Sequence, residues 1–207
     1  MTMTLYGARG CGSAAVEAVL ALAGIDYTLV EASPWERGPG YDALCRVSPL
    51  PRIPTLVLAD GTVLTESAAI LAWLVERGGA HALGTGGDAA RATELRWIVF
   101  LACNVYNAIS IRDFPERWVD GEQPRRDLRE HGLARLREAW DALAASVSPS
   151  PYLAGARLGA LDVYAAMMSR WSDTRPWLRE RHPHVDASLA LTERNGIVAR
   201  VWARHFD

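Results

Sequence analysis

Apolar positions in the first third of the chain change spacing several times. Residues 3–6 form a short apolar run that predicts a strand, and after a glycine-containing loop residues 16–23 carry apolar side chains at helical spacing. Gly24 then occupies the place of a C-terminal helix cap. Residues 25–30 predict a second strand, and residues 31–47, rich in proline and glycine, leave room only for a loop and one short helix.

The clearest local pattern is a hairpin. Residues 55–58 and 62–64 are apolar runs on either side of Asp60 and Gly61, a pair that predicts a two-residue turn. A helix follows directly, with an apolar face over residues 70–74. The predicted order of this part of the chain is β-α-β-β-β-α.

The pattern becomes almost entirely helical beyond a glycine-rich stretch. We assign residues 1–78 to a first domain, 79–90 to a linker and 91–207 to an all-helical second domain. Four segments of the second domain carry helical spacing, and prolines appear as breaks between them. The segments are residues 94–111, 125–146, 162–171 and 195–206, and the prolines are Pro149, Pro151, Pro176 and Pro183. Long segments with short connections predict a helical bundle.

Composition narrows the class of partner. The formal net charge is −2 and no basic block occurs, which argues against nucleic acid or a membrane surface as the main partner. The chain start lacks a signal-peptide pattern and no apolar run reaches spanning length, so we expect a cytoplasmic protein. Cys11, Cys45 and Cys103 form no CxxC pair, and we predict neither a disulfide framework nor a metal site.

Two features of the first domain suggest a ligand site. Pro54 directly precedes a predicted strand. Either this proline only marks an ordinary strand start, or the Ile53–Pro54 peptide is cis and presents the Ile53 backbone to an extended peptide ligand. Glu66 and Ser67 stand where the third helix begins. A carboxylate could bind the Ser67 hydroxyl and the helix N-terminus while Glu66 faces an ammonium group. Ser67 could equally be a helix cap alone.

The chain resembles the cytosolic glutathione S-transferase family, with bacterial members among the relatives. The resemblance rests on Pro-Arg-Ile-Pro-Thr-Leu at residues 51–56, Asp-Gly after it, and Leu-Thr-Glu-Ser at residues 64–67. It extends over essentially the whole chain, but its motifs are dense only between residues 49 and 74. It implies a fold of α/β plus all-α class, with a thioredoxin-like domain before the helical one, and glutathione as co-substrate without a metal.

The resemblance also implies roles for single residues. Ile53 and Pro54 match the residues that pair with the cysteinyl backbone of glutathione, and Glu66 and Ser67 match the pair that holds its γ-glutamyl group. Arg52 stands where relatives often have glutamine, lysine or tyrosine, and is a candidate partner of the glycyl carboxylate.

Catalysis requires the glutathione sulfur to be a thiolate near neutral pH, because the thiolate is the nucleophile. A hydroxyl or thiol at the start of the first helix could stabilise it, assisted by the helix dipole. Ser13 is our first candidate, since related bacterial proteins have serine at a similar place, and Cys11 is the second. Without a ligand Ser13 would be a helix cap and Cys11 an inert loop residue. The usual catalytic tyrosine of the family has no clear counterpart, because Tyr6 lies within the predicted strand.

The resemblance places a second, apolar substrate in the helical domain, facing the first helix. A histidine of one bacterial class contacts the site at the position of Tyr106, although a tyrosine between helices is also commonly structural. The candidate pocket residues are Cys103, Tyr106, Asn107, Tyr164 and Trp171. Near them Gly159 and Asp162 resemble a helix-capping box of the family, so we assign Asp162 to folding.

We therefore predict a homodimeric glutathione S-transferase, with a role in detoxification, that conjugates the glutathione thiolate to a small apolar electrophile. Two alternatives stay open. One is a glutathione-dependent thiol transferase or peroxidase that uses Cys11. The other is a non-catalytic binding protein on the same fold.

Overall fold

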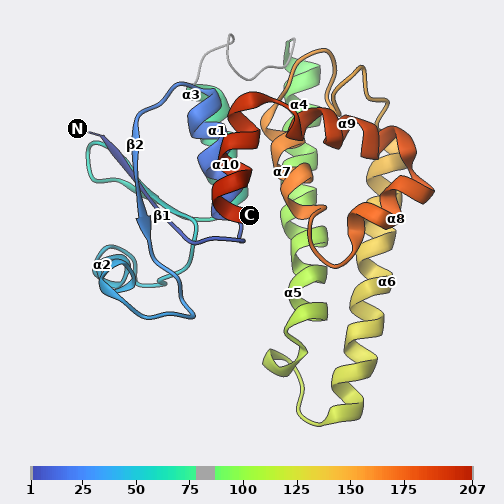
Figure 1. Cartoon of the computed structure of the whole chain (residues 1–207), viewed down its shortest axis with the longest axis horizontal. Coiled ribbons are helices and arrows are strands. Elements are labelled where there is room, and N and C mark those ends of the chain that lie inside the picture. Colours follow the sequence, from blue (N-terminus) through green and yellow to red (C-terminus); the bar gives the residue numbers. More distant parts are fainter. Residues whose placement is uncertain (1, 78–86, 207) are drawn as a thin grey trace.

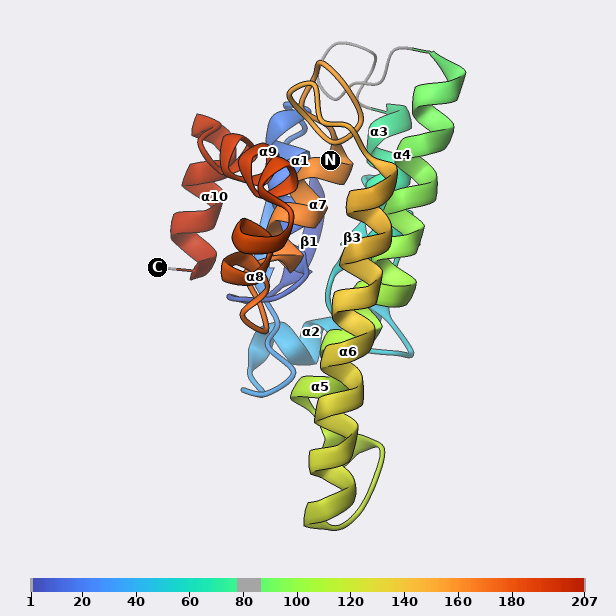
Figure 2. The same cartoon turned by 90° about the vertical axis from the view of Figure 1, so that its right-hand side faces the viewer.

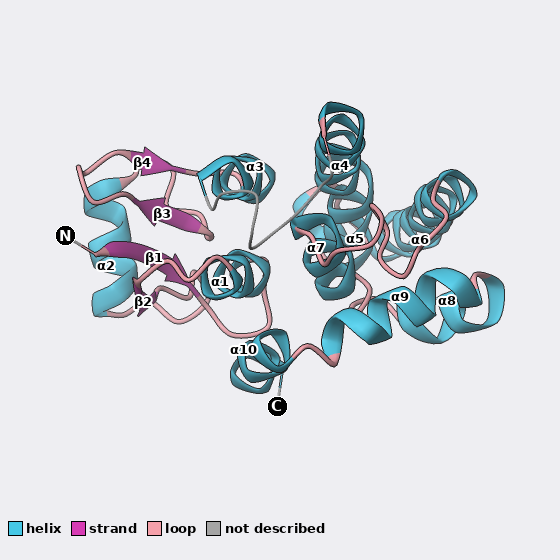
Figure 3. Cartoon of the chain, turned by 90° about the horizontal axis from the view of Figure 1, so that it is seen from above, coloured by secondary structure: helices cyan, strands magenta, loops and turns pink. Residues whose placement is uncertain are grey.

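A four-stranded sheet with helices on both faces forms the first part of the chain (Figure 1). The computed structural model describes residues 2–77 and 87–206. The strands are β1 (Met3–Gly7), β2 (Tyr27–Glu31), β3 (Thr55–Val57) and β4 (Val63–Leu64), and the helices are α1 (Ser13–Leu22), α2 (Pro39–Val47) and α3 (Ser67–Arg77). The strand order is β2-β1-β3-β4, with β1 parallel to β2 and antiparallel to β3. Helix α2 lies on one side of the sheet and α1 and α3 on the other (Figure 3). The thioredoxin-like arrangement is confirmed, and α2 is the one short helix expected before β3.

The β3–β4 hairpin differs from the prediction by one residue. Val57 pairs with Val63, and the Leu58 N–H donates to the Thr62 carbonyl at 2.8 Å, so the loop contains three residues, 59–61, instead of two. Gly61 closes that loop at φ +89°, a left-handed conformation that glycine adopts without a steric penalty.

The second part of the chain is helical (Figure 2). Its elements are α4 (Asp88–Phe100), η1 (Leu101–Tyr106), α5 (Asn107–Asp113), η2 (Pro115–Arg117), α6 (Glu122–Ser146), α7 (Ala160–Met168), α8 (Thr174–Arg181), α9 (Pro183–Glu193) and α10 (Gly196–Phe206). The predicted helix over 94–111 is therefore one continuous rod made of α4, the π-helical segment η1 and α5. Most of the expected linker, residues 79–90, lies outside the described residues, and α4 already begins at Asp88.

Helices α8 and α9 were not predicted, because two prolines were interpreted as breaks. Pro183 is the first residue of α9 and Pro176 is the third residue of α8. The N–H groups of a first helical turn have no partner within the helix, so a proline there costs no hydrogen bond. At these positions proline marks a helix start.

Helix α7 lies in the centre of the helical part, and all of its residues are buried. Its N-terminus is closed by two buried carboxylates. Asp162 accepts the backbone N–H groups of Gly159 at 2.9 Å and Leu153 at 2.7 Å, while Glu94 of α4 accepts that of Ala160 at 3.0 Å. The predicted folding role of Asp162 is thereby confirmed.

Helix α10 returns to the first part of the chain and packs against α1 (Figures 1 and 3). Glu17 of α1 is fully buried at this contact. Its carboxylate interacts with Arg204 and His205 of α10 and accepts the Tyr27 hydroxyl at 3.0 Å. Helices α1 and α10, which lie near opposite ends of the chain, are thus joined through the buried Glu17 carboxylate.

Candidate functional site

A cavity of about 490 Å³ lies where β3 and α3 face the helical part of the chain. The first part contributes the residues around the Ile53–Pro54 peptide and the start of α3, while η1, α5 and α7 form the opposite wall. The lining residues are Arg52, Ile53, Pro54, Thr65, Glu66, Ser67, Ala102, Cys103, Tyr106, Asn107, Ser110 and Tyr164. The fold therefore brings together all five residues predicted to bind glutathione.

The Ile53–Pro54 peptide is cis, which decides between the two interpretations of this proline. Thr55, the next residue and the first of β3, is buried, and its hydroxyl donates to the Arg52 carbonyl at 2.7 Å. The Ile53 N–H forms no hydrogen bond within residues 2–77 and 87–206. A backbone donor is thus available beside the cavity.

The start of α3 forms a second part of the cavity wall. Glu66 has φ +62°, a left-handed conformation that is unfavourable for a residue with a side chain, and its carbonyl accepts the Ile70 N–H at 3.0 Å. Its carboxylate is exposed to the cavity, whereas the Ser67 hydroxyl oxygen lies 2.6 Å from that of Tyr164 on α7. Burial raises the pKa of Tyr164, which therefore stays protonated at neutral pH.

The two candidates for thiolate stabilisation differ in access. Ser13 is fully buried and lines neither this cavity nor the one described next. Its hydroxyl accepts the Ala8 N–H and donates to the Ala8 carbonyl, each at 3.1 Å. The Cys11 sulfur lies 2.9 Å from the Ala8 carbonyl oxygen and 3.2 Å from the Ser13 hydroxyl. Burial raises the pKa of the Cys11 thiol, so it is protonated at neutral pH.

A second cavity of about 320 Å³ adjoins the first. Four of its lining residues are aromatic, and its walls come from the loop before α1, the loop before α2, η1, α5, η2 and the segment after α7. The lining residues are Gly10, Cys11, Trp35, Tyr106, Ile109, Ser110, Asp113, Phe114, Arg117 and Trp171. Of the residues predicted for one second-substrate pocket, Trp171 lies here, Cys103, Asn107 and Tyr164 line the first cavity, and Tyr106 lines both.

Tyr106 separates the two cavities. Its ring contacts the Trp171 ring edge-on at 5.5 Å, and a Cβ atom at Gly12 would lie only 2.9 Å from its hydroxyl oxygen, so the side chain packs directly on the start of α1. Burial raises the pKa of Tyr106 to about 12, an effect that a hydrogen bond from the Gly12 backbone partly opposes. A neutral hydroxyl donor therefore stands where the cavities meet.

Sequence analysis missed seven of the residues that line the second cavity, among them Trp35, Phe114 and Arg117. The Trp35 side chain is 58% exposed within a loop rich in proline and glycine, and an isolated tryptophan in such a loop was the available signal. Phe114 and Arg117 lie in the turn after α5, where no motif marks them.

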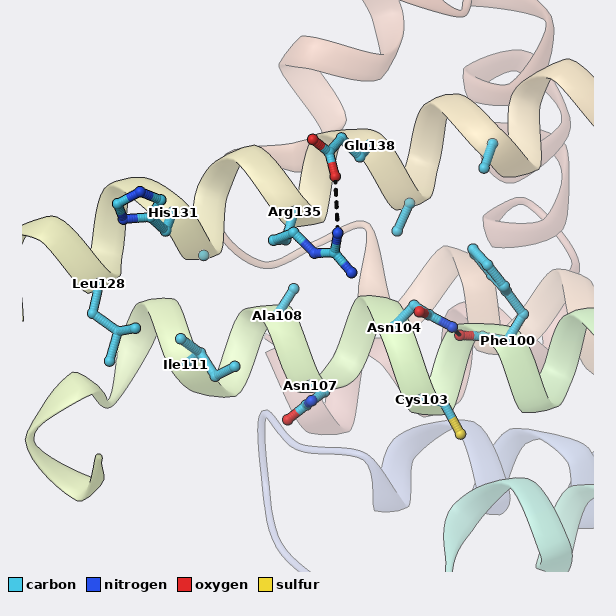
Figure 4. Close-up of a pocket in the computed structure, with 13 residues that line it drawn as sticks. Phe100, Cys103, Asn104, Asn107, Ala108, Ile111, Leu128, His131, Arg135 and Glu138 are labelled. Carbon is cyan, nitrogen blue, oxygen red and sulfur yellow. Dashed lines mark hydrogen bonds and ion pairs between the residues drawn. The ribbon is translucent and has the colours of Figure 1, made fainter. Parts of the chain in front are cut away.

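A third hollow of about 360 Å³ runs between the α4–α5 rod and α6 (Figure 4). His131, Arg135 and Glu138 of α6 line it; the Arg135 side chain reaches from α6 toward the rod and forms an ion pair with Glu138 at 3.3 Å. Cys103 and Asn107 line both this hollow and the first cavity.

Residues 2–77 and 87–206 contain neither a membrane-spanning helix nor a cluster of metal-binding side chains. No helix there combines the length and the apolar character needed to cross a membrane. No group of three or more histidine, cysteine, aspartate or glutamate side chains there could hold a metal ion.

Comparison with known proteins gives a consistent result. Residues 13–77 match the family model described as glutathione S-transferase, N-terminal domain. The chain is 30% identical over 184 residues to the uncharacterized GST-like protein YncG of Escherichia coli K12, covering 88% of each chain, and 26% identical to glutathione S-transferase GstA of Escherichia coli O157:H7, covering 82% of each. A glutathione transferase homolog from Sulfitobacter, solved with bound glutathione, superposes with a TM-score of 0.85 at 22% identity over 98% of both chains.

Proposed function

The chain belongs to the glutathione S-transferase family, and from that premise we propose that it joins the thiolate of glutathione to a small apolar electrophile. The observation that carries the proposal is the first cavity, where the Ile53 backbone, Glu66, Ser67 and Arg52 line one space. Each of these groups complements one part of a γ-glutamyl-cysteinyl-glycine tripeptide, and the relative from Sulfitobacter was solved with this ligand bound.

The start of α3 suits the γ-glutamyl end of the tripeptide. The unpaired N–H groups of the first helical turn and the helix dipole favour the α-carboxylate. Tyr164 keeps its proton and can donate it to the Ser67 oxygen, which leaves the Ser67 proton for that carboxylate. The Glu66 carboxylate then faces the ammonium group, and Arg52 offers a guanidinium to the glycyl carboxylate at the other end.

We assign stabilisation of the thiolate to Tyr106, which was first predicted only as a pocket residue. Its neutral hydroxyl lies at the junction of the two cavities, where a sulfur attacking from the first cavity into the second would pass. Ser13 is less suited, since its proton is directed to the Ala8 carbonyl. We give Ser13 the role of holding the loop that contains Cys11.

The state of Cys11 favours conjugation over thiol transfer. Thiol transfer by Cys11 would require its thiolate, and burial raises the pKa of this thiol. In conjugation the sulfur of glutathione forms the new bond, and the electrophile occupies the second cavity with Tyr106 beside the reacting atoms.

We also propose that the protein is a homodimer. Leu95 and Val99 lie four residues apart on α4, and their side chains are 39% and 47% exposed; Val63 of β4 is 38% exposed. Two apolar side chains at this spacing share one helix face, and covering that face against a second copy would remove it from water.

Calorimetry with glutathione and kinetics of single variants test the assignment. We expect heat of binding at millimolar glutathione. We also expect Tyr106→Phe to raise the pKa of the bound glutathione thiol, which can be measured by the absorbance of the thiolate. The same variant should lower kcat about tenfold to hundredfold, because a hydrogen bond to a charged group is lost. Cys11→Ser is the matched control and should keep conjugation.

Three outcomes would redirect the assignment. Absence of binding heat would favour a non-catalytic protein. Loss of activity in Cys11→Ser with Tyr106→Phe unaffected would favour thiol transfer. An unchanged thiol pKa in Tyr106→Phe would remove Tyr106 from the reaction while leaving the transferase assignment intact.

A further inference from the structure

We infer that the electrophile taken by the second cavity is a planar aromatic compound carrying a carboxylate, and that Arg117 binds that carboxylate. The inference rests on the proposed function, because it assigns the second cavity to the electrophile. It changes the apolar electrophile proposed above to one whose apolar ring carries a single charged group, and it names the residue that selects that group.

The walls of the second cavity favour a flat ring. Trp35, Tyr106, Phe114 and Trp171 come from three separate segments of the chain and line the same space. Aromatic rings attract one another through offset and edge-on contacts beyond simple burial of apolar area. A cavity of about 150 Å³ accommodates benzene in another protein, so about 320 Å³ leaves room for one ring with substituents.

Two charged side chains line this cavity, and only the acidic one has a partner of opposite charge among the described residues. Asp113 is engaged by Arg112, with 2.6 Å between the nearest nitrogen and oxygen, and by the Ser172 hydroxyl at 3.3 Å. Arg117 forms no ion pair within residues 2–77 and 87–206; its guanidinium lies over the Phe114 ring, with its carbon 4.0 Å from the ring centroid. The charge left without an opposite partner at the cavity is therefore positive.

The contact with Phe114 restricts where the Arg117 guanidinium lies. A guanidinium is planar, and its N–H groups form a fork that can bind a carboxylate through two hydrogen bonds. A substrate ring inside the cavity with its carboxylate toward Arg117 thus satisfies the aromatic walls and the unpaired charge together.

A pair of matched compounds provides the test. Chloronitrobenzoate, with nitro ortho to chlorine and the carboxylate para to chlorine, differs from its methyl ester in the charge, in one methyl group and in the reactivity of the ring. In either case the glutathione thiolate forms a carbon–sulfur bond at the ring carbon that bears chlorine. The carbon–chlorine bond then breaks, chloride leaves with the electron pair, and the thiol proton goes to solvent. Each kcat/KM is divided by the rate constant of the same compound's uncatalysed reaction with glutathione.

We expect the wild-type protein to favour the acid over the ester at least tenfold on this normalised scale. Arg117→Gln should lower the value for the acid about tenfold, change that for the ester less than twofold, and leave the KM for glutathione unchanged. Arg126→Gln on α6 is the matched control, because it removes the same charge from an exposed position that does not line the cavity, and it should change neither compound.

The outcomes separate the two proposals. Equal normalised values for acid and ester, or an equal loss for both in Arg117→Gln, would overturn the carboxylate inference while the transferase assignment stands. If neither compound reacted faster than its uncatalysed rate although glutathione binds, the carboxylate inference would fall; absence of glutathione binding as well would remove the transferase assignment too.

Discussion

The hydroxyl oxygens of Ser67 and Tyr164 lie 2.6 Å apart, which ties the start of α3 to the buried helix α7. These residues are 97 positions apart in the chain. The contact places the proposed γ-glutamyl site against a helix whose residues are all buried, so the position of Ser67 depends on the packing of the helical part. A residue that was predicted to line the second-substrate pocket would therefore act on glutathione.

Removing the Tyr164 hydroxyl should weaken glutathione binding. In Tyr164→Phe the Ser67 oxygen loses its donor and its hydroxyl can rotate away from the ligand carboxylate, so we expect the Kd for glutathione to rise about fivefold to tenfold. Calorimetry measures this directly. Tyr152→Phe, which makes the same chemical change away from both cavities, should keep the wild-type Kd. An unchanged Kd in Tyr164→Phe would mean that Ser67 does not need this partner.

Glu66 should show opposite effects on stability and binding. Its φ of +62° is unfavourable for a residue with a Cβ atom, so Glu66→Gly should raise the free energy of unfolding by up to about 1 kcal/mol while lowering glutathione affinity about tenfold. Urea unfolding and calorimetry measure the two effects. Glu66→Gln keeps the side-chain shape, so it should lose affinity without gaining stability. Wild-type affinity in both variants would place the ammonium group of glutathione elsewhere.

Asp162 should make stability depend on pH. Burial raises the pKa of this carboxyl from 3.8 to about 7, and the charge of Glu94 adds to the effect, although hydrogen bonds from the backbone oppose it. Between about pH 4 and pH 7 the Asp162 carboxyl is therefore protonated in the folded state and ionised in the unfolded state. The contribution of Asp162 is greatest below pH 4 and declines as the pH rises to 7.

The free energy of unfolding, measured from pH 4 to pH 7 in wild type and Asp162→Asn, checks this prediction. We expect the wild-type curve to fall more steeply with rising pH, by up to about 1.4 kcal/mol per pH unit. Asp162→Asn should also lose about 1–3 kcal/mol at pH 5, because an amide cannot accept both the Leu153 and Gly159 N–H groups in this geometry. Parallel curves would show that the carboxyl stays ionised.

A charge on the exposed face of α4 should dissociate the proposed dimer. Val99→Asp places a carboxylate on the apolar helix face that the second copy would cover. Burying that charge in the interface is unfavourable, so we expect a monomer in sedimentation experiments. Trp118, at 55% exposure in the turn before α6, supplies a control: Trp118→Asp removes a larger exposed apolar side chain and should leave the assembly unchanged. Dissociation of both variants, or of neither, would argue against α4 as the interface.

The local part of the site was predictable from the sequence. The hairpin, the proline before β3 and the pair Glu66 and Ser67 follow one another within fifteen residues, so turn chemistry and helix-start preferences identify them without tertiary information. Ser13 shows the limit of such reasoning. A serine at a helix start is the same pattern whether its hydroxyl faces a ligand or the Ala8 carbonyl, and only the folded loop distinguishes the two.

The second cavity could not be predicted in the same way. Trp35 and Trp171 meet across it from loops far apart in the sequence, and no periodic pattern relates them. Arg117 appears in the sequence as one of many arginines. What sets it apart is its place in the wall of the second cavity, over the Phe114 ring and without an acidic partner in the described part of the chain, and this emerges only from the folded structure.

The buried cluster between α1 and α10 has a consequence for synthesis. Glu17 emerges from the ribosome early, but His205, one of its partners, follows 188 residues later. Until then the carboxylate lacks its cationic partners on α10, so burying it is unfavourable, and the face of α1 that α10 covers stays exposed to water. The thioredoxin-like part therefore reaches its final packing only when translation of the helical part is nearly complete, so a chain cut before α10 should expose this face to chaperones and proteases.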